Sequence, residues 1–393
     1  MKEKTAQGGV CAPRGFKAAG AACGLKASGD LDLCILAADE RCAAAATFTS
    51  NAFHAAPVEL TRERIAEDGM LQAVVVNSGN ANAWTGERGI RDARSMADLT
   101  AEAIGSHPRD VAVSSTGIIG RYLEMEKIAG GISEAAGRLR TVGGGEAARA
   151  IMTTDTFPKE AAWEYGGFVV GGMAKGAGMI KPDMATMLAF VTTDAEVDPA
   201  TLGRALRSAV DLSFNRITID GCMSTNDMVL AMASGASGMR VGEEEMEKAL
   251  HRVCSRLAHD IVEDGEGATK FIAVRLHEAA SEAEARHAAM CVAESALVKT
   301  AFFGKDPNWG RIVQAVGQAV TTADPAKMRV KICGFTVAES GEAAEVDRAG
   351  LEEAMQGRNL DVDVFLGRGD AHIEVWTCDY SYDYVKINAE YHT

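Results

Sequence analysis

The residues with the clearest chemical potential lie in one short stretch, residues 172–190, with the sequence GMAKGAGMIKPDMATMLAF. Closely spaced glycines allow tight turns there, and a proline then fixes a bend before Ala185 and Thr186. A small residue before a hydroxyl residue in such a turn suits an N→O acyl shift, in which the Thr186 hydroxyl attacks the Ala185 carbonyl. Hydrolysis of the resulting ester would free the Thr186 amine, which then serves as the base for its own hydroxyl.

The same stretch has a plainer interpretation as a glycine-rich turn that leads into a strand, with Thr186 as an ordinary strand-forming residue. The local pattern taken alone favours this structural interpretation. Glycine-rich loops also hold phosphates, but this one lacks the GK[ST] order of a P-loop. The pattern around Thr186 therefore leaves the structural and the catalytic alternatives open.

The elements that must position this stretch alternate between short apolar runs and longer helical ones. Strands are predicted at residues 31–37, 73–77, 110–115, 168–173, 187–193, 228–233, 271–276, 328–332, 361–365 and 373–377. Helices are predicted at residues 89–104, 124–139, 145–152, 199–212, 243–261 and 281–302. This mixture predicts an α/β protein whose sheets are covered by helices, with Thr186 at the first residue of a strand, just after a glycine-rich turn. No linker obviously divides domains, and the closest to a boundary is the position of Thr186.

The composition limits the classes of function. The chain has 393 residues, 47% of them apolar, which is ample for a large core and suggests two or three lobes. A net charge of −15 disfavours nucleic acid and anionic membrane surfaces as partners. The start, MKEKTAQGGV, lacks the apolar stretch of a signal peptide, and no run of about 18 apolar residues predicts a membrane span. We expect a cytoplasmic protein.

The cysteines and histidines give little support for a metal site. The nine cysteines show no CxxC spacing, and Cys34, Cys254 and Cys291 lie within apolar patterns as small buried hydrophobes. The eight histidines show no HExxH spacing, and His259 and His287 are expected to be solvated or packed on helices. We therefore predict no metal site.

Sequence blocks in a fixed order alter the balance between the two interpretations of Thr186. The stretch KGAGMIKPDMATMLAF resembles the cleavage-site signature of the ornithine acetyltransferase (glutamate N-acetyltransferase) family of arginine biosynthesis. Other blocks resemble the same family along nearly the whole chain: GFKAAG (15–20), FTSNAFHAAPV (48–58), VVVNSGNANAWTG (74–86), SSTGIIG (114–120), MTTDTFPK (152–159), SFNRITIDGCMSTND (213–227), EDGEGATK (263–270), GKDPNWGRI (304–312) and NAEYHT (388–393).

The resemblance implies roles for several residues around the predicted nucleophile. It makes Thr186 both the self-cleavage residue and the acyl acceptor, with the cut between Ala185 and Thr186. It places the oxyanion hole at Thr116 and Gly117 of the SSTG motif, whose hydroxyl and backbone N–H are suitable donors to a tetrahedral intermediate. Without the resemblance, SSTG is merely a polar turn after a strand.

The resemblance also implies a set of substrate-binding residues. Lys175 matches a lysine that takes a carboxylate or polarises the acetyl group, and the TTDT block supplies either Thr153 or Thr154, with Thr153 slightly favoured. Glu266 matches a glutamate whose charge suits a substrate amine. The terminal pair, Asn388 and Thr393, implies that the C-terminus folds back onto the site. The plain alternatives are a surface lysine, a turn glutamate and a frayed tail.

The family further implies a layered α-β-β-α sandwich of the kind found in self-processing N-terminal-nucleophile-like acetyltransferases. Cleavage would give an alpha chain, residues 1–185, and a beta chain, residues 186–393, assembled as a heterotetramer of two of each. The implied reaction is ping-pong: Thr186 takes acetyl from N-acetylornithine, ornithine leaves, and the amine of glutamate attacks the ester. Because one amide is exchanged for another, the resemblance implies no cofactor. Some family members also accept acetyl-CoA, and the sequence does not decide this point.

Two positions depart from the family pattern. Asp183 stands where an asparagine usually precedes Met-Ala-Thr, so an amide donor is replaced by a charge near the nucleophile. Cys222 and Met223 replace more polar residues. Two competing functions are a self-processing aminopeptidase, which would hydrolyse rather than transfer, and a non-catalytic binding protein for acetylated amino acids.

Overall fold

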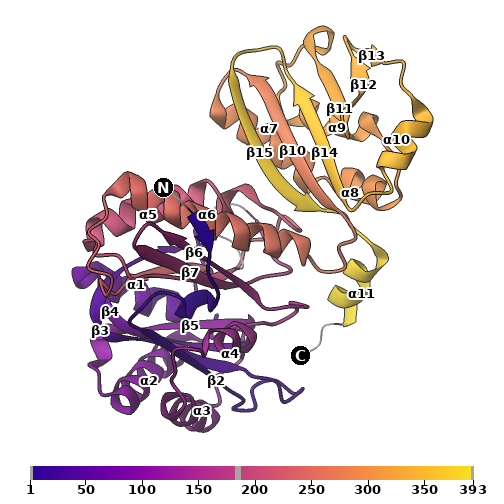
Figure 1. Ribbon diagram of the computed structural model, residues 1–393. Coiled ribbons are helices and arrows are strands. Elements are labelled where there is room, and N and C mark those ends of the chain that lie inside the picture. Colours follow the sequence, from indigo (N-terminus) through magenta and orange to yellow (C-terminus); the bar gives the residue numbers. More distant parts are fainter. Residues whose placement is uncertain (1–2, 182–186, 391–393) are drawn as a thin grey trace. The chain divides into compact units, whose positions relative to one another are not determined.

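The computed structural model describes residues 3–181 and 187–390, which form two compact units (Figure 1). Unit 1 contains the described residues up to position 215 together with residues 222–261. Unit 2 contains residues 216–221 and those from position 262 onward. Ala185, Thr186, Asp183 and Thr393 lie outside the described residues.

Unit 1 is built on a nine-stranded sheet with the order β1-β6-β7-β8-β9-β3-β4-β5, and β2 pairs with β3 beside this path. The strands are β1 (Glu3–Thr5), β2 (Phe16–Ala21), β3 (Leu33–Phe48), β4 (Met70–Asn80), β5 (Val111–Ile118), β6 (Lys159–Tyr165), β7 (Phe168–Lys175), β8 (Leu188–Thr193) and β9 (Met228–Ala233). The long strand β3 joins the two halves of the sheet, because its first part pairs with β4 and its second part with β9. A register shift between Ala37 and Cys42 separates the two parts.

The two halves of this sheet enclose a shared core. Its buried side chains come from both β3–β4 and β7–β9: Cys34, Leu36, Val74, Val76, Met173, Leu188, Phe190, Met228, Leu230 and Met232. A second core lies between the β2–β5 half and helices α2 and α3, where Ile35 and Val75 of the sheet join Met96 and Ile132 of the helices. Figure 1 shows α5 and α6 beyond β6 and β7, and α2 and α3 beyond β2–β5. The layering is therefore α-β-β-α, as the family resemblance implies.

The helices of unit 1 begin and end at recognisable signals. They are α1 (Ala56–Asp68), α2 (Gly86–Ile104), α3 (Met125–Gly137), α4 (Gly144–Ala150), α5 (Pro199–Asp211) and α6 (Glu243–Glu263), with short 3-10 turns η1 (Gly9–Cys11), η2 (Pro108–Asp110) and η3 (Phe214–Arg216). Asp198 caps α5 by accepting a hydrogen bond from the Thr201 N–H, and the helix starts with a proline. Gly172 of β7 lets α6 approach closely, because a Cβ there would lie 2.9 Å from the Val253 side chain.

Unit 2 is a six-stranded sheet with the order β13-β12-β11-β14-β10-β15. Its strands are β10 (Phe271–Ala279), β11 (Arg329–Ile332), β12 (Phe335–Glu339), β13 (Glu342–Ala343), β14 (Asn359–Phe365) and β15 (Ala371–Cys378). Its helices are α7 (Glu282–Glu294), α8 (Ala296–Phe303), α9 (Trp309–Ala319), α10 (Arg348–Ala354) and α11 (Tyr382–Glu390), with the 3-10 turn η4 (Pro325–Lys327). One apolar core joins the sheet to α7, α8 and α9, with Val274, Val362 and Val375 from the strands and Val292, Phe302 and Val316 from the helices.

Several elements differ from the sequence-based expectation. The single helix predicted at residues 281–302 is wrong: α7 and α8 are separate helices, because Ser295 adopts an extended backbone and its hydroxyl caps α8. Elements β2, α1, β6, α9, α10 and α11 were not anticipated. Residues 388–390 belong to the helix α11 rather than to a frayed tail.

The predicted fragments 1–185 and 186–393 are defined by a cleavage and not by compactness. Along the described chain, the two units meet between residues 215 and 216, 221 and 222, and 261 and 262. Strands β8 and β9, which follow residue 186 in sequence, lie between β7 and β3, which precede it. The predicted fragments would therefore share one continuous sheet in unit 1.

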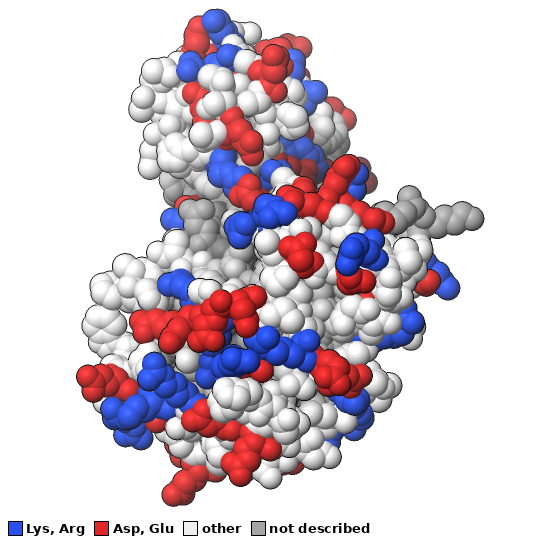
Figure 2. Space-filling model, turned by 90° about the vertical axis from the view of Figure 1, so that its left-hand side faces the viewer, with Lys and Arg blue, Asp and Glu red and all other residues white. Residues whose placement is uncertain are grey.

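The surface carries both signs of charge in spite of the net charge of −15. On the face shown in Figure 2, acidic and basic side chains form small interspersed clusters. Among the described residues, no helix is long and apolar enough to cross a membrane.

Candidate active site

The predicted oxyanion residues lie at the end of β5, beside β4. Thr116 is 5% exposed, and Gly117 pairs with Gly79 across the two parallel strands. Gly117 has φ +131°, and a Cβ there would lie 2.4 Å from the Gly79 carbonyl carbon and 2.6 Å from the Asn80 nitrogen. Only glycine fits this close backbone approach. The position of the Gly117 amide is thus fixed by the strand pair.

Lys175 is the last residue of β7 and brings a buried ammonium to Thr116. The Lys175 Nζ lies 3.5 Å from the Thr116 Oγ1, and the lysine is 3% exposed. Opposite Lys175 on β8 is Leu188, two residues after the predicted nucleophile Thr186. Two of the predicted site residues, 59 positions apart in sequence, are therefore in contact.

Asp155 organises the loop that carries the predicted substrate threonines. Its carboxylate accepts hydrogen bonds from the Thr153 N–H (3.0 Å) and the Gly176 N–H (2.7 Å) and pairs with the Lys159 Nζ at 2.7 Å. Burial alone would raise the pKa of the Asp155 carboxyl, but the charges of Lys159 and Lys175 outweigh it and lower the pKa to about 2. Asp155 is therefore a fixed anion that joins the Thr153 loop to the backbone that follows Lys175. Thr153 and Thr154 are both half-buried.

Asp227 is a site residue that sequence reasoning missed. It precedes β9, is 1% exposed, and its Oδ1 accepts a hydrogen bond of 2.7 Å from the Met187 N–H. Within residues 3–181 and 187–390, its buried Oδ2 has no hydrogen-bond partner. Burial raises the pKa of the Asp227 carboxyl well above its usual value, against the opposing effects of the Met187 N–H and the Lys175 ammonium. The signal available in the sequence was a charged residue at the head of the wholly apolar run 228–233.

Asn226, the neighbour of Asp227, holds the ends of β4 and β5 in place. Its side-chain amide donates to the Ala81 carbonyl at 2.6 Å and to the Ser115 carbonyl at 2.9 Å. The STND segment that ends at Asp227 therefore contacts the strand end that carries the predicted oxyanion residues and the first described residue after position 186.

Two predicted binding residues meet within unit 2. The Asn388 side-chain amide of α11 donates to the Glu266 Oε2 at 2.8 Å and to the Tyr384 carbonyl at 3.0 Å. Glu266 is 8% exposed. The structure thus places Asn388 beside Glu266 and Lys175 beside Thr116, while Thr186 and Thr393 lie outside the described residues.

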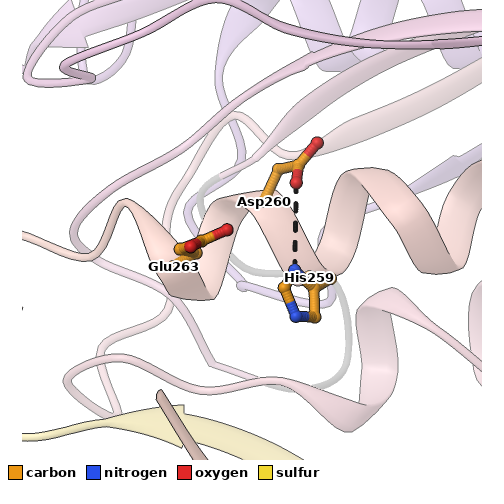
Figure 3. Close-up of side chains that lie close together, drawn as sticks. All are labelled: His259, Asp260 and Glu263. Atoms are coloured by element: carbon orange, nitrogen blue, oxygen red, sulfur yellow. Dashed lines mark ion pairs between the residues drawn. The ribbon is translucent and has the colours of Figure 1, made fainter. Parts of the chain in front are cut away.

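Among the described residues, one group of potential metal ligands stands out, at the end of α6. His259, Asp260 and Glu263 have ligand atoms within 4.8 Å of one another (Figure 3). The Asp260 carboxylate is already paired with the Arg256 guanidinium at 3.0 Å, and the His259 Nδ1 lies 3.8 Å from Asp260. Because a guanidinium already neutralises this carboxylate, the group carries no metal assignment.

Comparison with known proteins identifies the family. The ArgJ family model matches residues 17–393. The chain is 49% identical over 398 residues to the arginine biosynthesis bifunctional protein ArgJ of Symbiobacterium thermophilum, which covers 98% of this chain and 99% of that protein. It is 44% identical over 400 residues to the protein of that name from Bacillus licheniformis, covering 99% of this chain and 98% of that protein.

A solved structure is also similar to part of the chain. The ornithine acetyltransferase of Mycobacterium tuberculosis, complexed with ornithine, is 43% identical, with a TM-score of 0.44, and the match covers 46% of this chain and 98% of that one. The family assignment depends on the full-length matches in sequence. The chain belongs to the ArgJ family and is an acyltransferase of arginine biosynthesis.

Proposed function

We propose that this protein transfers the acetyl group of N-acetylornithine to glutamate, with Thr186 as the nucleophile after self-cleavage between Ala185 and Thr186. The observation that carries the proposal is the contact of 3.5 Å between the Lys175 Nζ and the Thr116 Oγ1, beside the strand that follows Thr186. A hydroxyl donor and a buried cation at one point suit an intermediate that develops negative charge on oxygen.

Self-cleavage is the first step of the proposed mechanism. The Thr186 hydroxyl attacks the Ala185 carbonyl, and the tetrahedral intermediate collapses with rupture of the C–N bond, so that the hydroxyl proton ends on the Thr186 nitrogen. Water then hydrolyses the ester and returns the hydroxyl to Thr186. The products are a new carboxyl at Ala185 and a new amine at Thr186, an arrangement in which the amine is the base for the hydroxyl.

Transfer then proceeds in two half-reactions. The Thr186 oxygen attacks the acetyl carbonyl of N-acetylornithine, Thr116 and the Gly117 N–H donate to the developing oxyanion, and ornithine leaves with the proton that the nucleophile gave up. The amine of glutamate next attacks the acetyl ester and regenerates the Thr186 hydroxyl. Lys175 binds a carboxylate or polarises the acetyl group, and Asp155 supports its positive charge and holds the next amide.

The remaining substrate contacts come from the loop of Thr153 and Thr154 and from the Glu266–Asn388 pair. The Glu266 carboxylate is suited to the ammonium group of ornithine, and its hydrogen bond to Asn388 orients it. We assign Thr393 to the same set. No cofactor takes part in the proposed reaction, because it exchanges one amide for another.

The decisive experiment combines intact mass with an acetyl-transfer assay. We expect the purified protein to appear as two chains that meet at Ala185 and Thr186, and we expect N-acetylglutamate to form from N-acetylornithine and glutamate. The variant Thr186→Ala should remain a single chain and form no product. Cleavage that persists in this variant would refute the assignment of the nucleophile.

The assay also separates the competing functions. A hydrolase would release acetate without glutamate, whereas a binding protein would remain one chain without transferase activity. Replacing N-acetylornithine by acetyl-CoA decides whether the protein has the second donor activity that the word bifunctional in the names of its relatives suggests. For the assembly, we propose a heterotetramer of two alpha and two beta chains, which native mass spectrometry would measure directly.

A further inference from the structure

The loop between β2 and β3 is held rigidly by one buried carboxylate. Asp32 is fully buried, and its two oxygens accept hydrogen bonds from four consecutive backbone N–H groups. The donors and distances are Cys23 (2.7 Å), Gly24 (3.0 Å), Leu25 (2.6 Å) and Lys26 (3.1 Å). Four charge-assisted bonds fix the path of this loop before any ligand arrives.

This loop brings Lys26 against the strand pair that forms the predicted oxyanion site. A Cβ placed on Gly79 would lie 3.3 Å from the Leu25 carbonyl oxygen and 3.5 Å from the Lys26 Cγ. Gly79 is the residue that pairs with Gly117. The aliphatic stem of Lys26 therefore packs beside the Gly79–Gly117 contact.

The Lys26 and Lys175 ammonium groups both interact with the charge of Asp155. The Lys26 Nζ donates to the Leu31 carbonyl at 2.7 Å, and the side chain is half-buried. Burial lowers the pKa of Lys26, while Asp32, Asp30 and Asp155 raise it and Lys175 lowers it further. Since an ammonium has three N–H donors and the Leu31 carbonyl uses one, Lys26 retains donors for a ligand.

Two lysines near one oxyanion site exceed what a single carboxylate needs. Glutamate carries two carboxylates, and a carboxylate that leaves water without a cation or a donor is strongly disfavoured. We propose that Lys26 binds the side-chain carboxylate of the acceptor, while Lys175 serves the reacting end, so that the site selects a dicarboxylate. This inference rests on the proposed function, because it concerns the acceptor of that same reaction.

The test compares glutamate with glutamine as acceptors, with N-acetylornithine as the donor and the full processed protein as the enzyme. The variant Lys26→Gln removes the charge but keeps an N–H donor for the Leu31 carbonyl. We expect kcat/KM for glutamate to fall by about 10–100-fold, the worth of one charged hydrogen bond, mainly through KM. The kcat/KM for glutamine should change less than about threefold. Lys26→Arg, which keeps the charge, should retain most of the preference for glutamate that Lys26→Gln loses.

A matched control separates binding from support of the loop. Lys127 also donates to this loop, at 3.0 Å from its Nζ to the Gly24 carbonyl, but its side chain is exposed and pairs with Glu124. Lys127→Gln should leave kcat/KM unchanged for both glutamate and glutamine. The assignment would be overturned if Lys26→Gln lowered kcat/KM equally for glutamate and glutamine, or changed neither value.

An inhibitor experiment on the unaltered protein covers the case in which the Lys26 variants are not processed. Glutarate should compete with glutamate at least about tenfold more tightly than glutaramate, in which one carboxylate is an amide. Equal inhibition by the two compounds would show that no second cation is used. If the unaltered protein forms no N-acetylglutamate from N-acetylornithine, the proposed function itself fails. If the unaltered protein forms this product and Lys26→Gln still prefers glutamate to glutamine, only the inference about Lys26 fails.

Discussion

The buried pair of Asp155 and Lys159 offers the sharpest test of how unit 1 is stabilised. Both side chains are fully buried and 2.7 Å apart, and the Asp155 carboxylate also accepts the Gly176 N–H. The variant Asp155→Asn keeps an oxygen that can accept from the amide but removes the charge. The Lys159 ammonium then loses this anion while its side chain stays fully buried.

The magnitude follows from the burial of the pair. Removing one partner of a buried ion pair costs about 3–5 kcal/mol, because the remaining charge stays desolvated. At about 2 °C per kcal/mol for a domain of this size, the Tm of unit 1 should fall by about 6–10 °C. An exposed pair provides the contrast: Glu196 and Arg240 lie 2.6 Å apart with side chains 49% and 84% exposed, so Glu196→Gln should leave the Tm nearly unchanged.

Denaturant unfolding followed by far-UV circular dichroism would measure both variants at pH 7 and again at lower pH. The folded-state pKa of Asp155 is about 2 against an ordinary value of 3.8, so its ionised form stabilises the folded state above pH 3.8. That contribution is lost as the pH falls toward 2. The difference between the unaltered protein and Asp155→Asn should therefore shrink below pH 4. A cost under 1 kcal/mol at pH 7, or a difference that does not vary with pH, would refute this reasoning.

Three further predictions concern the candidate site. Gly117→Ala should abolish transfer and lower the free energy of unfolding, measured by urea titration, by at least about 2 kcal/mol. The reason is that its Cβ would lie 2.4 Å from the Gly79 carbonyl carbon. A variant with normal stability would contradict that geometry. Thr116→Ala should lower kcat by about a hundredfold with unchanged unfolding, and full activity would remove Thr116 from the oxyanion hole. Because the pKa of Asp227 is raised in the folded state, the unfolded state releases its proton first and stability falls as the pH rises above 3.8. As the pH rises from 5 to 8, the urea midpoint of Asp227→Asn should therefore fall less than that of the unaltered protein. An equally steep fall in both proteins would show that Asp227 does not titrate as described.

The strands were predicted best where burial leaves a wholly apolar run. Residues 228–233 were assigned correctly at both ends, since polar residues flank six buried apolar ones. Strand β3 was predicted to end at residue 37 but continues to Phe48, because Asp39 and Glu40 lie exposed at a register shift that interrupts the apolar pattern without ending the strand. Helix α1 was missed because its apolar periodicity is weak, although Pro57 lies in its first turn.

The site shows which contacts a linear pattern does not contain. The partnership of Thr116 with Lys175 was implied only by the family resemblance, since 59 residues separate them. Asp155 lies within a block that was recognised, but its role depends on cations from two strands that only the fold brings together. Asp227 was missed for the same reason, because its partner is the Met187 amide, 40 residues earlier in the chain. Spacing predicts local structure, whereas the electrostatics of a buried group depend on neighbours that are distant in sequence.

Because β8 and β9 lie between β7 and β3, a cut before β8 would change how the protein refolds. The uncut chain reaches this sheet by a unimolecular reaction, in which all strands belong to one polymer. If the chain is cut before β8 as proposed, the same sheet is made of two polymers, and full unfolding would let the central strands diffuse away from the outer ones. Refolding would then require an encounter between two chains and would slow in proportion to dilution. Such a two-chain protein would be kinetically stable: it would persist because the barrier to unfolding is high, and not because it refolds readily.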